Sequence, residues 1–151
     1  MTIRWTAEDA SRELMSVLPL LNRIISAELR IEAGEETTMP QFRLLALLYD
    51  QPQTLSILAA KRRVSLQAAG ESIQTLVERG WVTRTPDPTD RRQSLLALSD
   101  IGRAHYLQAQ SRMLTRLIPL LEKLSDEEMD AVQLTLSALH RVLNSIETDE
   151  K

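Results

Sequence analysis

The stretch 55–102 constrains the fold more than any other part of this chain. It contains a short predicted helix, 55–63, and then a second amphipathic helix that Ser65 opens and Gly80 ends. Two apolar, strand-like runs follow within 81–98, separated by a turn rich in proline and aspartate. Two helices and a hairpin with a basic tip together predict a winged helix-turn-helix. That arrangement offers a helix to one DNA groove and a charged loop to the next.

Helix-start patterns also precede this stretch. Thr6-Ala-Glu-Asp9 predicts a helix start with acids in its first turn, and apolar residues spaced three and four apart continue the helix to the charged run 32–36. We expect Pro19 to kink this helix or to mark its true beginning. Thr38-Met-Pro-Gln41 fits a capping box that opens a helix reaching Asp50.

Capping signals recur toward the C-terminus. Thr54 or Ser56 caps the first helix of the helix-turn-helix, and Ser99 caps a long helix that we expect Pro119 to bend. Ser125-Asp-Glu-Glu128 is a second capping box, and it opens a last helix with apolar residues at helical spacing.

Composition narrows the fold class and the kinds of site. Hydrophobic residues make up 43% of the chain but aromatic residues only 3%, so the core must be aliphatic, which favours a mainly α fold in one domain. The chain has no cysteine, which excludes disulfides, thiol nucleophiles and cysteine-based zinc sites. His105 and His140 are isolated on predicted helices, so we expect no metal site. We find no catalytic motif and predict no enzyme activity and no cofactor.

The sequence shows neither a membrane-spanning segment nor a signal peptide. No run of eighteen apolar residues exists, and the N-terminus lacks the apolar segment of a signal peptide. We therefore expect a cytoplasmic protein with no membrane partner.

Charge is distributed unevenly. The net charge is −3, but the segment 61–92 has seven basic and four acidic residues, which gives +3 and leaves −6 for its flanks. A positive field on one region steers anionic partners more than the net charge does.

The amphipathic helices at both ends carry more apolar surface than one small winged unit can cover. We therefore predict a single domain over 1–151, in which 38–98 form the winged lobe. Segments 6–33 and 99–147 are predicted to form a bundle of dimerisation helices in a symmetric homodimer.

Several motifs together resemble one family. They are Thr38-Met-Pro-Gln41, Leu58-Ala59, Ser65, Leu76-x-x-x-Gly80-Trp-Val82, Asp87-Pro-x-Asp-Arg-Arg92 and Leu96-x-Leu-Ser-x-x-Gly102. Across roughly 14–143 the chain resembles the MarR family of bacterial and archaeal transcription regulators. The resemblance implies an obligate dimer that binds pseudo-palindromic double-stranded DNA as a repressor. It also implies relief of repression by a small aromatic or anionic effector.

The turn Asp90-Arg91-Arg92 lies at the tip of the predicted hairpin. Taken alone, such a cluster is usually a solvated turn. The resemblance implies instead that Arg92 enters the DNA minor groove, that Asp90 holds the Arg92 guanidinium, and that Arg91 meets phosphate.

The helix that begins after Ser65 is the predicted recognition helix, although it could also be an ordinary packing helix. Gln67 could pair with adenine and Glu71 could accept a hydrogen bond from cytosine, while the small Ala68 lets the backbone approach the groove. No basic residue occurs between Ser65 and Glu78, where relatives usually carry Arg, Thr or Ser at several positions.

Phosphate affinity would therefore depend mainly on basic residues outside that helix. These are Lys61, Arg62, Arg63, Arg91 and Arg92. The run 61–63 could equally serve the dipole of the helix that it ends. The acidic pI and this base-poor helix leave a second reading open: a winged-helix module that binds proteins and has lost its DNA affinity.

Overall fold

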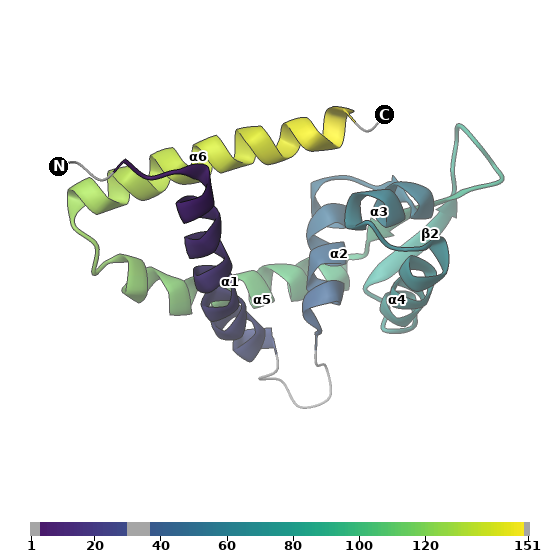
Figure 1. Ribbon diagram of the computed structural model, residues 1–151. Helices are drawn as coiled ribbons and strands as arrows, with labels where there is room; N and C mark the ends of the chain where they lie inside the picture. The colour runs from purple at the N-terminus through teal and green to yellow at the C-terminus, as the bar shows by residue number, and fades with distance from the viewer. Residues whose placement is uncertain (1–3, 30–36, 150–151) are drawn as a thin grey trace.

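The residues that the structure describes form six helices and a small antiparallel sheet. The computed structural model describes residues 4–29 and 37–149, with side chains described up to residue 145 (Figure 1). The elements are α1 (Ala7–Leu29), α2 (Met39–Asp50), β1 (Gln53–Thr54), α3 (Leu55–Arg62), α4 (Leu66–Glu78), β2 (Val82–Pro86), β3 (Ser94–Leu98), α5 (Asp100–Leu121) and α6 (Asp126–Asp149). The mainly α winged helix-turn-helix with a hairpin wing is confirmed.

Local capping chemistry sets where most helices begin. The Thr38 hydroxyl accepts a hydrogen bond from the backbone N–H of Gln41, and the Gln41 side chain accepts one from the Thr38 N–H, as the capping box predicts. Thr54, rather than Ser56, caps α3. Ser65 and Ser99 cap α4 and α5 as predicted.

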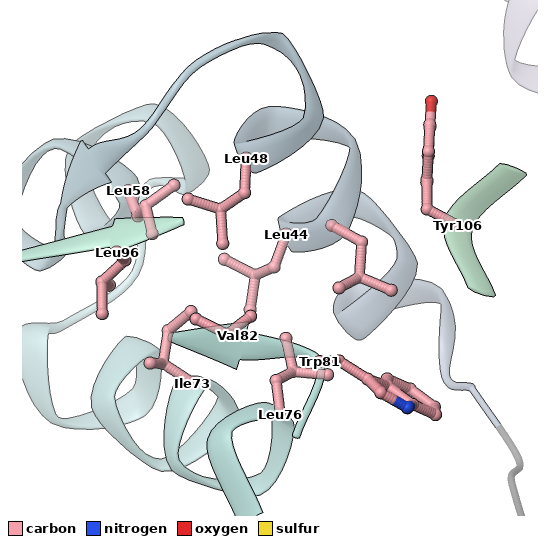
Figure 2. Close-up of a cluster of buried hydrophobic side chains, with 10 residues drawn as sticks. Leu44, Leu48, Leu58, Ile73, Leu76, Trp81, Val82, Leu96 and Tyr106 are labelled. Carbon is pink, nitrogen blue, oxygen red and sulfur yellow. The ribbon is translucent and has the colours of Figure 1, made fainter. Parts of the chain in front are cut away.

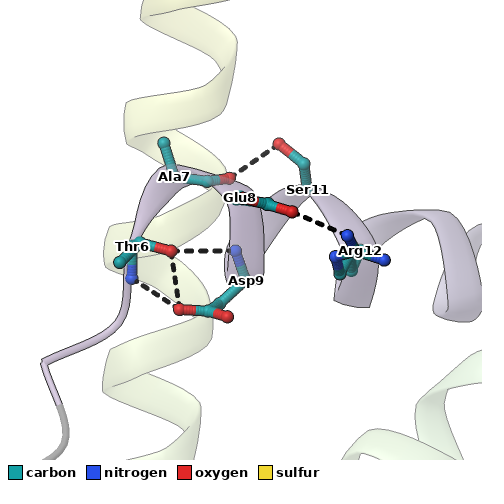
Figure 3. A network of polar contacts seen from close by, with 6 residues as sticks. All are labelled: Thr6, Ala7, Glu8, Asp9, Ser11 and Arg12. Carbon is teal, nitrogen blue, oxygen red and sulfur yellow. Dashed lines mark hydrogen bonds and ion pairs between the residues drawn. The ribbon is translucent and has the colours of Figure 1, made fainter.

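The two remaining helices begin with reciprocal caps as well. Ser125 and Glu128 exchange hydrogen bonds at the start of α6. At the start of α1, the Asp9 carboxylate accepts from both the N–H and the hydroxyl of Thr6, and the Asp9 N–H donates back to that hydroxyl (Figure 3). The hydrogen bonds from Thr6 also lower the pKa of Asp9.

The core of the winged lobe lies between α2, α3, α4 and the sheet. Leu44, Leu58, Ile73, Leu76 and Leu96 are fully buried there and converge from all of these elements (Figure 2). Most of this core is aliphatic, as expected, but Trp81 and Tyr106 also belong to it, and Phe42 and Tyr49 pack against it.

The sheet has three strands in the order β1-β3-β2. The hairpin β2–β3 was predicted, but β1 was not, because two residues are too short to show an alternating pattern. Gln53 pairs with Leu96 and Thr54 with Leu95, so β1 gives the outer edge of β3 a partner.

The start of α5 is docked on the chain that leaves α4. The Ser99 N–H donates to the Trp81 carbonyl, and the Ser99 hydroxyl donates to the Gly80 carbonyl. Trp81 is buried and stacks on His105, with 3.8 Å between ring centroids, and His105 bonds the Thr37 hydroxyl. Both residues therefore pack the start of the hairpin against α5.

Of the two outcomes expected for Pro19, the structure excludes one. Pro19 lies inside α1 and does not mark its beginning, because the Thr6–Asp9 cap starts the helix twelve residues earlier in the sequence. Trp5, Met15 and Met129 are all exposed. The predicted helix end at 32–36 lies outside the described residues.

Large parts of α1, the second half of α5 and α6 present apolar side chains to solvent. Exposed positions include Leu14, Val17, Leu18 and Leu21 in α1, Leu114 and Ile118 in α5, and Met129, Leu136 and Leu143 in α6. No described side chain of α6 is buried. An amphipathic helix of 24 residues gains most of its stability from packing its apolar face. This exposed face must therefore pack against another apolar surface. None of the described helices is long and apolar enough to cross a membrane.

Candidate nucleic-acid interface

The helix α4 divides into a buried face and an open face. Ala69, Ile73 and Leu76 pack into the core, whereas Gln67 and Glu71 lie on the exposed side. Because Ser65 caps the N-terminus through the Ala68 N–H, the first turn is regular up to its exposed end. The open face is thus polar and presented by a rigid helix.

Gln67 and Glu71 form a hydrogen-bonded pair on this face. The Gln67 amide nitrogen donates to a Glu71 carboxylate oxygen at 3.2 Å, one helical turn away. The contact orients both groups and leaves the Glu71 carboxylate with further acceptor positions and the Gln67 amide with a second N–H. The pair can therefore accept and donate hydrogen bonds at neighbouring points of a groove floor.

A second polar chain links α4 to the wing. The Gln74 amide donates to Glu78 at 3.0 Å and accepts from the Arg84 guanidinium, on β2, at 3.2 Å. This chain joins the exposed face of α4 to the root of the hairpin. Sequence reasoning missed Gln74 and Arg84, although the four-residue spacing of Gln74 and Glu78 was a signal that a side-chain pair could form there.

Aspartates shape the turn of the wing. The Asp87 carboxylate accepts from the N–H and the hydroxyl of Thr89, and these hydrogen bonds lower the pKa of Asp87. The Asp90 carboxylate accepts from the backbone N–H of Arg92 and from the side chain of Gln93. Side-chain to backbone bonds of this kind fix tight turns.

Arg91 and Arg92 are both exposed at the wing tip. The expected ion pair between Asp90 and the Arg92 guanidinium is absent from this structure of the isolated chain, in which both residues are described. Asp90 instead binds the Arg92 backbone, because a carboxylate two residues back reaches that N–H within the turn itself. The guanidinium is left to project from the tip.

The basic run at the end of α3 lies directly before α4 in sequence. Arg63 takes a left-handed conformation with φ 51°, and its N–H bonds the carbonyls of Ala59 and Ala60, which closes the helix. Lys61 is exposed and Arg62 is half-buried. Burial and the charge of Arg43 lower the pKa of Arg62.

The other sequence-based expectations concern metals. Within residues 4–29 and 37–149, no group of histidine and acidic residues could hold a metal ion. His105 is used in packing, and His140 is exposed on α6. The helix α4, the end of α3 and the wing tip each expose polar or basic side chains.

The sequence is similar to a family model and to a curated protein, and both are transcriptional regulators. The family model described as "MarR family" matches residues 37–94. YdgJ of Bacillus subtilis, described as an uncharacterized HTH-type transcriptional regulator, is 26% identical over 136 residues, which are 89% of this chain and 82% of that protein.

Solved structures agree in fold. RV1404 from Mycobacterium tuberculosis superposes with a TM-score of 0.81 at 27% identity, over 93% of this chain and 96% of that one. FabT from Streptococcus pneumoniae, solved in complex with DNA, has a TM-score of 0.77 at 19% identity over 93% and 99% of the two chains. Together with the Asp-Pro-x-Asp-Arg-Arg turn, these matches show that the winged lobe is similar to the MarR family and that the chain shares the fold of the solved structures.

Proposed function

We propose that this regulator is a homodimeric repressor that binds a pseudo-palindromic DNA operator. The observation that carries the proposal is the joint exposure of the polar face of α4 and of the Arg91–Arg92 wing tip, linked through Gln74 and Arg84. Members of this family are DNA-binding transcription factors and not enzymes. With double-stranded DNA as its partner, we propose that the protein acts in the cytoplasm.

In this mechanism the dimer places two α4 helices in successive major grooves. Their centres would be about 34–36 Å apart, one turn of DNA. The two Arg92 side chains flank them in minor grooves, where the negative potential is strongest at narrow, A·T-rich sites. Lys61, Arg62, Arg63 and Arg91 would neutralise phosphates, while Ser65 and Ala68 lie where the backbone of α4 approaches the groove.

A small aromatic or anionic effector would act by changing the spacing of the two α4 helices. Support comes from the way α1 and α5 join the winged lobe to the exposed helices: Leu29 packs on Ala109 and Met113, and Glu28 pairs with Arg116. An effector bound near this junction relieves repression only if it binds one spacing better than the other.

A gel-shift assay on genomic fragments at two salt concentrations tests the proposal as a whole. We expect retarded fragments whose affinity falls steeply as salt rises, because phosphate contacts release counterions. A protein-interaction module with lost DNA affinity, which the base-poor α4 favours, would retard no fragment at either concentration.

Replacing Arg92 with alanine should weaken operator binding and make the dependence on salt shallower. Each subunit loses one cation that lies near the DNA phosphates. The slope of log K against log salt should therefore become shallower by about 0.9 for each half-site. Fluorescence anisotropy at four salt concentrations measures both quantities. Arg12→Ala is the matched control, since this exposed arginine pairs with Glu8 on α1, away from the winged lobe (Figure 3). An Arg92→Ala isotherm equal to that of the control would remove the wing from the mechanism.

Replacing Glu71 with glutamine tests whether this side chain reads a base. Glutamine keeps the length of the side chain and its bond to Gln67 but adds an N–H donor, so the preferred base at one operator position should change. The expected discrimination between bases is about 1–3 kcal/mol at that position. Selection from a randomised DNA library gives the result. A uniform gain in affinity for all sequences would mean that Glu71 only repels phosphate.

A further inference from the structure

A hollow lies between α2 and α3, outside the face of α4. It has a volume of about 420 Å³ and is lined by Arg43, Ala46, Leu47, Asp50, Lys61 and Arg62. We call it the α2–α3 hollow. Its lining includes three cations and one acid, so it holds a net positive charge against an apolar wall.

The three cations in this hollow form no ion pair with any residue that the structure describes. Asp50 forms no ion pair or hydrogen bond with Arg43, Lys61 or Arg62, all of which belong to the described part of the chain. Arg62 is half-buried. The pKa of Arg62 is lowered by this burial and by the neighbouring Arg43 charge. Two like charges held close in a partly desolvated place destabilise each other unless an anion joins them.

The chemistry of the lining selects the anion. Two guanidinium groups offer planar forks that fit the oxygens of a phosphate bidentately, and Lys61 adds a compact charge at the rim. We propose that Arg43, Lys61 and Arg62 form a phosphate-binding site in the α2–α3 hollow.

Two sources could supply that phosphate. Arg62 is the last residue of α3, and only Arg63 and Val64 separate it from Ser65, the cap of α4. A DNA backbone phosphate beside the groove is therefore one source. A small phosphate ester is the other. The first case rests on the proposed function and widens its footprint beyond α4 and the wing. The second case is independent of DNA binding.

The first arm of the test uses inorganic phosphate alone. The thermal midpoint of the purified protein is followed against phosphate concentration, with chloride at equal ionic strength as the reference. We expect the midpoint of the unmodified protein to rise with phosphate, as it does for any ligand that binds only the folded state. The rise should be largely lost in Arg43→Ala, whose side chain is exposed and carries no core packing. It should persist in Arg4→Ala, which removes the same charge outside the hollow.

The second arm uses operator DNA. If a backbone phosphate occupies the hollow, the slope of log K against log salt should become shallower by about 0.9 for each half-site in Arg43→Ala. The slope should not change in Arg4→Ala. A fall in slope identifies DNA as the source. A phosphate-dependent midpoint with an unchanged slope identifies a free phosphate ester. If the unmodified protein binds no DNA, the first arm alone decides. Equal behaviour of Arg43→Ala and Arg4→Ala in every arm that can be run overturns the proposal.

Discussion

Replacing Gly102 with alanine is expected to unfold a large fraction of the protein at temperatures where the unmodified protein is folded. A Cβ atom at position 102 would lie 1.9 Å from the carbonyl oxygen of Trp81 and 2.7 Å from its carbonyl carbon. Both are backbone atoms, so no side chain can rotate to make room. Relief requires α5 to move away from the chain that follows α4.

That movement would break several contacts at once. The Gly102 N–H donates to the Ser99 hydroxyl, Ser99 binds the Trp81 and Gly80 carbonyls, and Trp81 stacks on His105. Alanine favours a helix over glycine by about 1 kcal/mol. Overpacking costs about 1–3 kcal/mol and occasionally more, and a clash at 1.9 Å with a backbone atom belongs at the upper end of that range. The cost of the clash exceeds the gain in helix propensity. It is a large part of a typical free energy of unfolding, which is about 5–15 kcal/mol.

Urea denaturation followed by circular dichroism, at one fixed protein concentration, measures this effect. Gly70→Ala is the matched control, because its Cβ would lie 3.8 Å from the nearest atom, a Leu55 methyl carbon, which is ordinary contact. The control should be more stable than the unmodified protein by about 0.5–1 kcal/mol, since it replaces a glycine inside α4. Equal stability of Gly102→Ala and Gly70→Ala would contradict the docking of α5 on Trp81.

Features that depend on residues close in sequence were predictable. The capping boxes at Thr38 and Ser125, the cap at Ser65 and the glycine that ends α4 all depend on contacts within four or five residues. Gly80 has φ 72°, the left-handed conformation expected just past a helix end. Such signals are complete within a short window, which is why most element boundaries followed from the sequence.

Features that depend on the meeting of distant segments were not predictable. Strand β1 exists only because Gln53 and Thr54 lie against β3, about forty residues later in the chain. The Arg84–Gln74 bond and the grouping of Arg43 with Arg62 also need the tertiary fold before they can be seen. The Asp90 contact is local and was predicted in part: Arg92 was the expected partner, but the Asp90 carboxylate accepts from the Arg92 backbone N–H and not from its guanidinium.

The second large effect concerns the terminal helices. Replacing Leu136 with glutamate should convert the proposed dimer into monomers. Leu136 is 54% exposed in the single chain and lies on the α6 stripe that also contains Met129, Val132, Leu139 and Leu143. In a dimer this stripe would be buried, and an unpaired carboxylate there costs about 3–5 kcal/mol. Each 1.4 kcal/mol is a factor of ten in an equilibrium constant. The dissociation constant of the dimer should therefore rise by about a hundredfold to more than a thousandfold.

Sedimentation equilibrium measures the change, and Ser137→Glu is its control. Ser137 is the exposed neighbour of Leu136, but helical geometry turns it well away from the stripe, so the same added charge should leave the dimer intact. Operator affinity should fall together with dimerisation in Leu136→Glu, because a monomer presents only one α4 to a two-part site. If Leu136→Glu stays dimeric, a different surface joins the subunits. If it is monomeric yet binds the full operator as tightly as the control, the two-helix mechanism itself is wrong, since the paired spacing of α4 would then contribute nothing to recognition.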